Sequence, residues 1–170
     1  MGNYWDEVKG DARVSESTDA GKILVPLNAT LIKRAKVSAQ WCWWIAGISA
    51  VNIFLGHFQV PVRFSVGLFF ADIVYAIGHA SGPVLTYVAL GVDAVALSAF
   101  VVLADHAKRL RVWASSAAIV IMSIDTLLLV WLAGFQGIGA VVIHLVCIYF
   151  LFVGMQSARV YRQRLAAGDA

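Results

Sequence analysis

Ionisable side chains occur singly, deep within long apolar stretches of this sequence. They are Asp72, Asp93, Asp125 and His144, and the first apolar stretch carries Asn52 instead. An ionised side chain at the middle of a bilayer costs at least ~2.5–3.5 kcal/mol, so such residues normally face a bundle interior or water. Carboxylate oxygens and imidazole nitrogens can bind protons and cations. These five residues are the candidate ion- or solute-binding residues, and their pattern does not identify a metal.

The sequence contains none of the common catalytic signatures. We find no His-Glu-x-x-His helix, no Gly-x-Ser-x-Gly turn, no glycine-rich phosphate loop and no Cys-x-x-Cys pair. The two cysteines, Cys42 and Cys147, lie within apolar stretches and show no sign of pairing. The sequence therefore assigns no catalytic residue and no cofactor, and it favours a protein that is not an enzyme.

The elements that must position these side chains are apolar helices. Hydrophobic residues make up 61% of the chain and charged residues 14%, against roughly 45–50% and 25% in soluble domains. The apolar runs cover residues 39–56, 64–78, 83–104, 112–133 and 138–159. About 20 helical residues are needed to cross ~30 Å of hydrocarbon, so the last three runs suffice, the first is near the limit and 64–78 is short. We predict an all-α integral membrane bundle of four spanning helices plus one short or re-entrant segment.

The basic residues predict the orientation of these helices. If only two of the first three runs cross, the basic clusters at 33–36, 108–111 and 159–164 all face the cytoplasm, as Lys and Arg usually do, and Arg63 alone lies outside. We therefore expect both termini in the cytoplasm. The predicted organisation is a polar cytoplasmic tail with a possible interfacial helix over residues 1–36, a transmembrane bundle over 37–160 and a cytoplasmic tail over 161–170.

This topology predicts the depth of the polar residues. At ~1.5 Å rise per residue, Asp93, Asp125 and His144 fall roughly 15, 12 and 9 Å below the outer boundary, so they can meet at one level. Alanines recur on the same helical stripes, and small residues let helices approach closely. Asp72 and Asn52 are the next candidates for the same polar core.

Three interpretations of this polar core remain open. Each polar residue can simply bond a neighbour and fix helix register, for example a protonated Asp125 bonded to His144. The residues can instead bind or translocate a cation, a proton or a small solute, which is the leading interpretation. A hydrolase using the carboxylates is the third, and no spacing favours it.

The alternative to transport is a non-catalytic accessory or scaffold subunit. The expected partners are the bilayer and a homo-oligomer or larger membrane complex, with no nucleic acid.

Several short segments resemble a family of small uncharacterised bacterial polytopic membrane proteins. The segments are Trp41-Cys42-Trp43-Trp44-Ile45-Ala46-Gly47-Ile48-Ser49 with Asn52, Gly67-Leu68-Phe69-Phe70-Ala71-Asp72-Ile73-Val74, Ile124-Asp125-Thr126-Leu127-Leu128, and Ile143-His144-Leu145 with Gly154. The resemblance covers most of residues 39–156. It implies a bacterial inner-membrane location and carries no activity.

Overall fold

The chain is helical throughout the part that the structure describes. The computed structural model describes residues 4–58, 60 and 67–168. Its elements are α1 (Tyr4–His57), α2 (Phe69–Ala80), α3 (Pro83–Lys108), α4 (Val112–Ala133), the short 3₁₀ helix η1 (Gly134–Gly137) and α5 (Ile138–Ala167). These described residues include no β-strand. The predicted all-α fold class is confirmed.

Among the described residues, three helices are long and apolar enough to cross a membrane. They are α3 with 26 residues, α4 with 22 and α5 with 30. Helix α2 is apolar but has only 12 residues, and positions 64–66 of the predicted run lie outside the described residues. Helix α1 does not reach the same apolarity, because its run at 39–56 contains Gln40, Ser49, Asn52 and three tryptophans.

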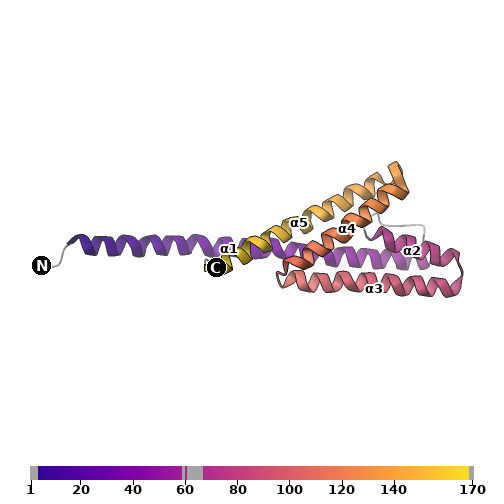
Figure 1. Ribbon diagram of the computed structural model, residues 1–170, viewed down its shortest axis with the longest axis horizontal. Coiled ribbons are helices and arrows are strands. Elements are labelled where there is room, and N and C mark those ends of the chain that lie inside the picture. The colour runs from indigo at the N-terminus through magenta and orange to yellow at the C-terminus, as the bar shows by residue number, and fades with distance from the viewer. Residues whose placement is uncertain (1–3, 59, 61–66, 169–170) are drawn as a thin grey trace.

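Helix α1 begins well before the apolar part of the chain. The first 36 residues, in which we predict a tail with a possible interfacial helix, belong to this one helix from Tyr4 onward. Its first half projects beyond the other helices (Figure 1). The boundary at residue 36 is thus a change in composition and not a break in the helix. At the other terminus, α5 continues past residue 160 to Ala167 and ends at Gly168, whose left-handed conformation (φ +81°) favours glycine.

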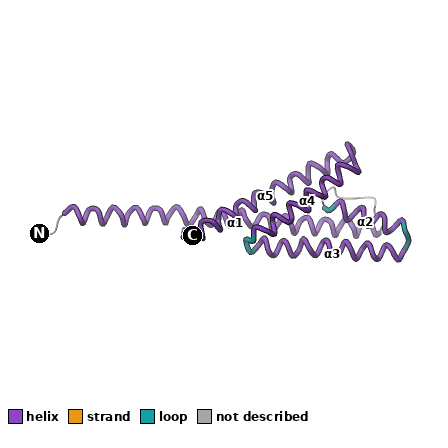
Figure 2. Tube along the Cα trace, in the orientation of Figure 1, coloured by secondary structure: helices purple, strands orange, loops and turns teal. Residues whose placement is uncertain are grey.

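Helix α1 lies at the centre of the bundle. Its second half packs against α3 on one side and α5 on the other, while α2 packs on α3 and α4 on α5. Successive long helices run in opposite directions (Figure 2). The core is built from Ile45 of α1, Phe100 of α3, Met122 of α4 and Leu151 of α5, all almost fully buried.

Large apolar side chains also cover the outside of the bundle. Val95, Leu127 and Trp131 are each more than two-thirds exposed, and many other Val, Leu and Ile side chains are similarly open. Soluble monomers rarely expose continuous apolar patches beyond a few hundred Å². An exposed apolar surface is expected of helices that cross a membrane, and three helices here are long and apolar enough to do so.

Helices α1 and α5 approach each other closely at Gly154. A Cβ atom added there would lie 2.6 Å from Ser38 Cβ and 2.8 Å from the Ser38 backbone nitrogen. The Ser38 hydroxyl is also engaged, at 2.9 Å from the Ala35 carbonyl and 3.0 Å from the Ser115 hydroxyl of α4. Gly154 therefore sets the spacing at which three helices meet.

We expect Gly154→Ala to destabilise the bundle by roughly 1–3 kcal/mol, because a contact with backbone cannot be relieved by rotating a side chain. Unfolding by sodium dodecyl sulfate in mixed micelles, followed by circular dichroism, measures the change. Gly139→Ala is the control on the same helix, since none of the described atoms lies within 4 Å of its added Cβ. Equal stability of the two variants would contradict the close crossing.

Candidate functional site

Helix α2 begins inside the bundle, and its first backbone N–H groups are bound by side chains of other helices. The N–H of Leu68 donates to the Ser49 hydroxyl of α1 at 2.7 Å. That hydroxyl in turn donates to the Ile45 carbonyl at 2.7 Å. The next two N–H groups, of Phe69 and Phe70, donate to Asp125 of α4. Helix starts leave such donors without intrahelical partners, and here α1 and α4 supply the acceptors.

A glycine is required where the chain enters this helix. Gly67 has φ +129°, which side-chain-bearing residues rarely adopt, and an added Cβ would lie 2.9 Å from the Ser49 hydroxyl oxygen and 3.2 Å from Ser49 Cα. The contact with α1 therefore depends on Gly67 as well as on Ser49.

We expect Ser49→Ala to cost about 1 kcal/mol, since one buried N–H of α2 loses its acceptor, as in the removal of a helix cap. The same detergent unfolding experiment checks this. The matched control is Ser98→Ala on α3, an exposed serine whose hydroxyl donates only to the Ala94 carbonyl of its own helix. A Ser49→Ala variant as stable as this control would show that the bond to Leu68 contributes nothing.

Asp125 makes three hydrogen bonds with described residues. Its Oδ1 accepts from the Phe70 N–H at 2.7 Å and its Oδ2 from the Phe69 N–H at 2.9 Å. The Nε2 atom of His144, on α5, lies 3.0 Å from Oδ2. Both side chains are 3% exposed. The contact between Asp125 and His144 that the sequence led us to expect is present, and it is buried where α2, α4 and α5 meet.

The geometry fixes the number of protons that this pair holds. The Nδ1 atom of His144 lies 2.8 Å from the Ala140 carbonyl, which can only accept, so Nδ1 carries a proton. A second proton must then lie between Nε2 and Oδ2, because two facing lone pairs at 3.0 Å would repel. Two N–H donors and the positive end of the α2 dipole stabilise an anionic carboxylate. Asp125 and His144 thus hold two protons between them and are net neutral with the second proton on either Nε2 or Oδ2.

Asp93 lies apart from that pair. It is on α3, 1% exposed, and neither carboxylate oxygen has a hydrogen-bond partner among the described residues. The side chain lines a hollow of about 430 Å³ between α1 and α3, with Ala50, Ile53, Phe54, His57, Phe58, Leu90, Ala94 and Leu97. Asp125 instead lines a separate hollow between α3 and α4. The three residues that we expected at one level do not meet, because this face of α3 is turned towards α1.

The two remaining candidates, Asp72 and Asn52, lie on α2 and α1. Asp72, half-buried on α2, is close enough for its carboxyl to interact electrostatically with Asp93. Asn52 is buried on α1 beside Ile53, which lines the same hollow. Both residues also have other interactions. Asp72 is thus within electrostatic range of Asp93, while Asp125 and His144 form a separate contact.

A further hollow lies at the end of the bundle where α2 turns into α3. It has about 320 Å³ and is lined by His57, His79, Gly82, Pro83, Thr86 and Tyr87. His57 lines both hollows. The Tyr75 hydroxyl lies 3.5 Å from His57 Nδ1, and the Tyr75 ring stacks on His79 with centroids 5.7 Å apart. Sequence reasoning missed these residues, because a histidine beside a turn carries no local sign of a cavity behind it.

Metal binding finds little support in this arrangement. Within the described ranges, no group of three or more His, Cys, Asp or Glu side chains has a geometry suited to a metal ion. Asp93 offers two free oxygens, whereas Ca²⁺ takes six to eight and Mg²⁺ near-octahedral coordination. The free carboxyl is better suited to a proton.

The fold and site together define an all-helical protein with three helices able to cross a membrane and a buried Asp125–His144 pair. Comparison with protein-family models, curated proteins and solved structures finds no match for this chain. The resemblance to a bacterial membrane protein family stays a prediction.

Proposed function

We propose that this chain is a polytopic membrane protein that takes up a proton from water at the His57 end of the bundle, binds it at Asp93 and passes it across the bilayer. One observation carries the proposal: the buried Asp93 carboxyl has both oxygens free among the described residues and faces a hollow. A carboxylate with no partner is costly at that depth, so ionisation of Asp93 requires water or a positive charge in the hollow. The Asp93 carboxyl is free to take up a proton from the hollow, whereas both oxygens of Asp125 are already in hydrogen bonds.

The route that we propose follows the two hollows. A proton enters between His79 and Tyr87, reaches His57, and passes to Asp93 through the larger hollow that His57 also lines. The charged or titratable groups facing Asp93 are His57 from α1 and Asp72 from α2. On the other side of Asp93, Phe100, Leu103 and Ala104 of α3 are packed into the core. Passage of the proton from Asp93 to the opposite face of the membrane requires those side chains to move.

The proposed topology has four crossing helices, with α2 entering partway. The second half of α1 supports a fourth crossing, because it packs between α3 and α5. The start of α2 at Asp125, roughly 20 Å along α4 from Val112, supports a re-entrant segment. Wherever side chains are described, the lysines and arginines lie at one end of the bundle, which we call the basic end. They are Lys33, Arg34, Lys36, Lys108, Arg109, Arg111, Arg159, Arg162 and Arg164. A cytoplasmic basic end, with both termini inside a bacterial inner membrane, follows the usual bias.

Proton exchange is testable with the full chain in vesicles that enclose a pH-sensitive dye. After an external pH jump, we expect internal acidification with the wild-type protein and a rate near that of empty vesicles with Asp93→Asn. Asp105→Asn is the matched control, because Asp105 is exposed at the basic end and paired with Arg109 at 2.9 Å. If the wild type does not exceed empty vesicles, or Asp93→Asn equals the wild type, the proposal is wrong.

A scaffold or accessory subunit is the second candidate function. The observation that favours it is the Asp125–His144 pair, whose hydrogen bonds hold the start of α2 and leave the carboxylate engaged on both oxygens. In that case the exposed apolar faces would pack against further copies or a larger complex. Chemical cross-linking in membranes followed by mass analysis separates the two functions: a scaffold gives discrete complexes that Asp93→Asn leaves intact, and it shows no proton exchange.

A further inference from the structure

A groove between α1 and α5 has an apolar body and one polar end. It has a volume of about 410 Å³ and is lined by Gln40, Trp41, Trp44, Ile45, Ile48, Ile143 and Val146. The Trp41 ring stacks on Phe150 of α5, with centroids 4.8 Å apart and planes 8° from parallel. This stacking holds the Trp41 side chain, which forms one wall of the groove, against α5. The stretch from Gln40 to Ile48 is about 12 Å long, which fits within one leaflet, about half of the ~30 Å hydrocarbon core.

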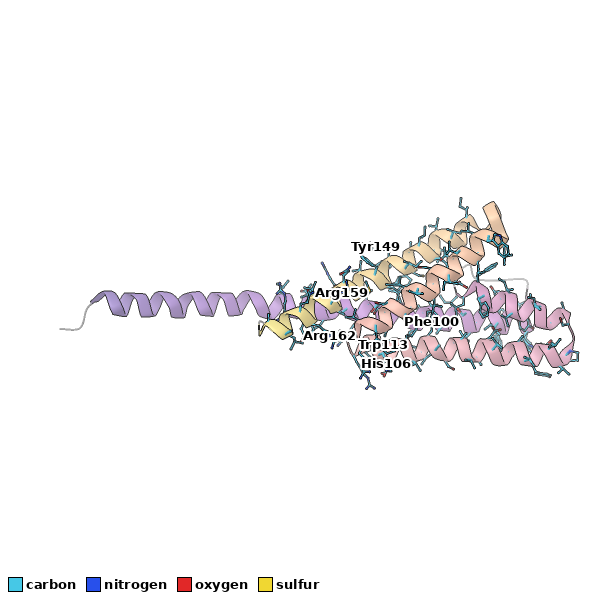
Figure 3. All side chains as sticks on the ribbon, in the orientation of Figure 1. Phe100, His106, Trp113, Tyr149, Arg159 and Arg162 are labelled. Carbon is cyan, nitrogen blue, oxygen red and sulfur yellow. The ribbon has the colours of Figure 1, made fainter. Side chains whose placement is uncertain are left out.

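Positive charge lies just beyond the polar end of this groove. Lys36 and Lys33 precede Gln40 by four and seven residues on α1, so all three share one helical face, and both lysines are exposed. On α5, Arg159 and Arg162 lie at the same end of the bundle (Figure 3). Wherever side chains are described at this end, the one acid is Asp105, which is paired with Arg109. The charge beside the groove is therefore not neutralised by another described side chain.

We propose that this groove binds one acyl chain of an anionic phospholipid, with the lipid phosphate held by Lys33 and Lys36. The Gln40 amide can donate to the same phosphate, and the Trp44 side chain lines the apolar body of the groove. Lysines beside a membrane surface attract anionic lipid. Charge complementarity is what selects this occupant over a zwitterionic lipid or a second copy of the chain. The site is independent of Asp93 and of proton binding.

Native mass spectrometry of the full chain in detergent tests the site, with phosphatidylglycerol and phosphatidylcholine of identical acyl chains as probes. We expect one phosphatidylglycerol to be retained at least about tenfold more strongly than phosphatidylcholine. The double variant Lys33→Gln/Lys36→Gln should remove that preference and leave phosphatidylcholine binding unchanged. Ile48→Trp, which fills the groove, should weaken both lipids.

The control is Lys108→Gln/Arg111→Gln, which removes two charges from the basic end away from the groove. Retention of the preference in this control supports a local site. An equal loss in the two double variants would mean that general surface charge attracts the lipid and would overturn the proposal. A dimer that Ile48→Trp dissociates would also overturn it, because the groove would then be covered by a second copy.

Discussion

Asp125→Ala is expected to destabilise the protein by about 3–5 kcal/mol, the range for breaking a buried ion pair by removing one partner. The substitution leaves the N–H groups of Phe69 and Phe70 without acceptors and His144 without its partner, all of them buried or half-buried. The start of α2 should detach from α4. Unfolding in mixed micelles measures the loss, and hydrogen exchange at residues 68–70 locates it.

The pair can be tested as a unit with a double-mutant cycle. His144→Ala alone removes one of three hydrogen-bond partners of Asp125, so we expect a smaller loss than with Asp125→Ala. The double variant should cost clearly less than the sum of the two, because each single change already breaks the shared contact. Asp105→Ala, an exposed acid on α3, is the control and should change stability by less than about 0.5 kcal/mol. Additive effects would contradict the proposed coupling.

Asp93→Leu is expected to act in the opposite direction and to stabilise the protein by about 1–3 kcal/mol, the cost that a buried polar group without partners imposes. Leucine is apolar, and the adjoining hollow of about 430 Å³ can accept its extra volume. The same substitution should abolish proton exchange. Thermal and detergent unfolding measure the first effect, and the vesicle assay measures the second.

Asp93→Asn separates charge from volume at this position. It keeps the shape of the side chain and its lack of partners, so we expect little gain in stability, together with the same loss of proton exchange. A gain of stability without function is the usual sign of a residue kept for activity. A destabilised Asp93→Leu variant would indicate that Asp93 has a structural partner and would remove the basis of the proposed site.

Much of the fold follows from local sequence. The predicted run at 112–133 has the same bounds as α4, and α3 and α5 begin at the predicted residues, Pro83 and Ile138. These starts are well marked because Gly82-Pro83 and the glycines at 134 and 137 interrupt long apolar runs, and proline fits the first turn of a helix. The far ends of α3 and α5 extend beyond the apolar runs, since lysine and arginine are good helix formers.

The grouping of the candidate site residues could not be predicted in the same way. Depth along a helix follows from residue counting, but the direction in which each side chain points depends on which helices pack together. Asp93 and Asp125 have similar expected depths and yet face different neighbours, α1 in one case and α2 with α5 in the other. The bonds that hold α2 also have no local signal, because their acceptors, Ser49 and Asp125, are 19 and 56 residues away along the chain.

The infrared carboxyl spectrum of the protein in lipid, recorded as a function of pH, tests the central claim most directly. We predict a protonated-carboxyl band that titrates while the protein remains folded, disappears in Asp93→Asn and persists in Asp105→Asn. A spectrum in which Asp93→Asn removes no band, or removes one that does not respond to pH, would contradict proton binding at Asp93.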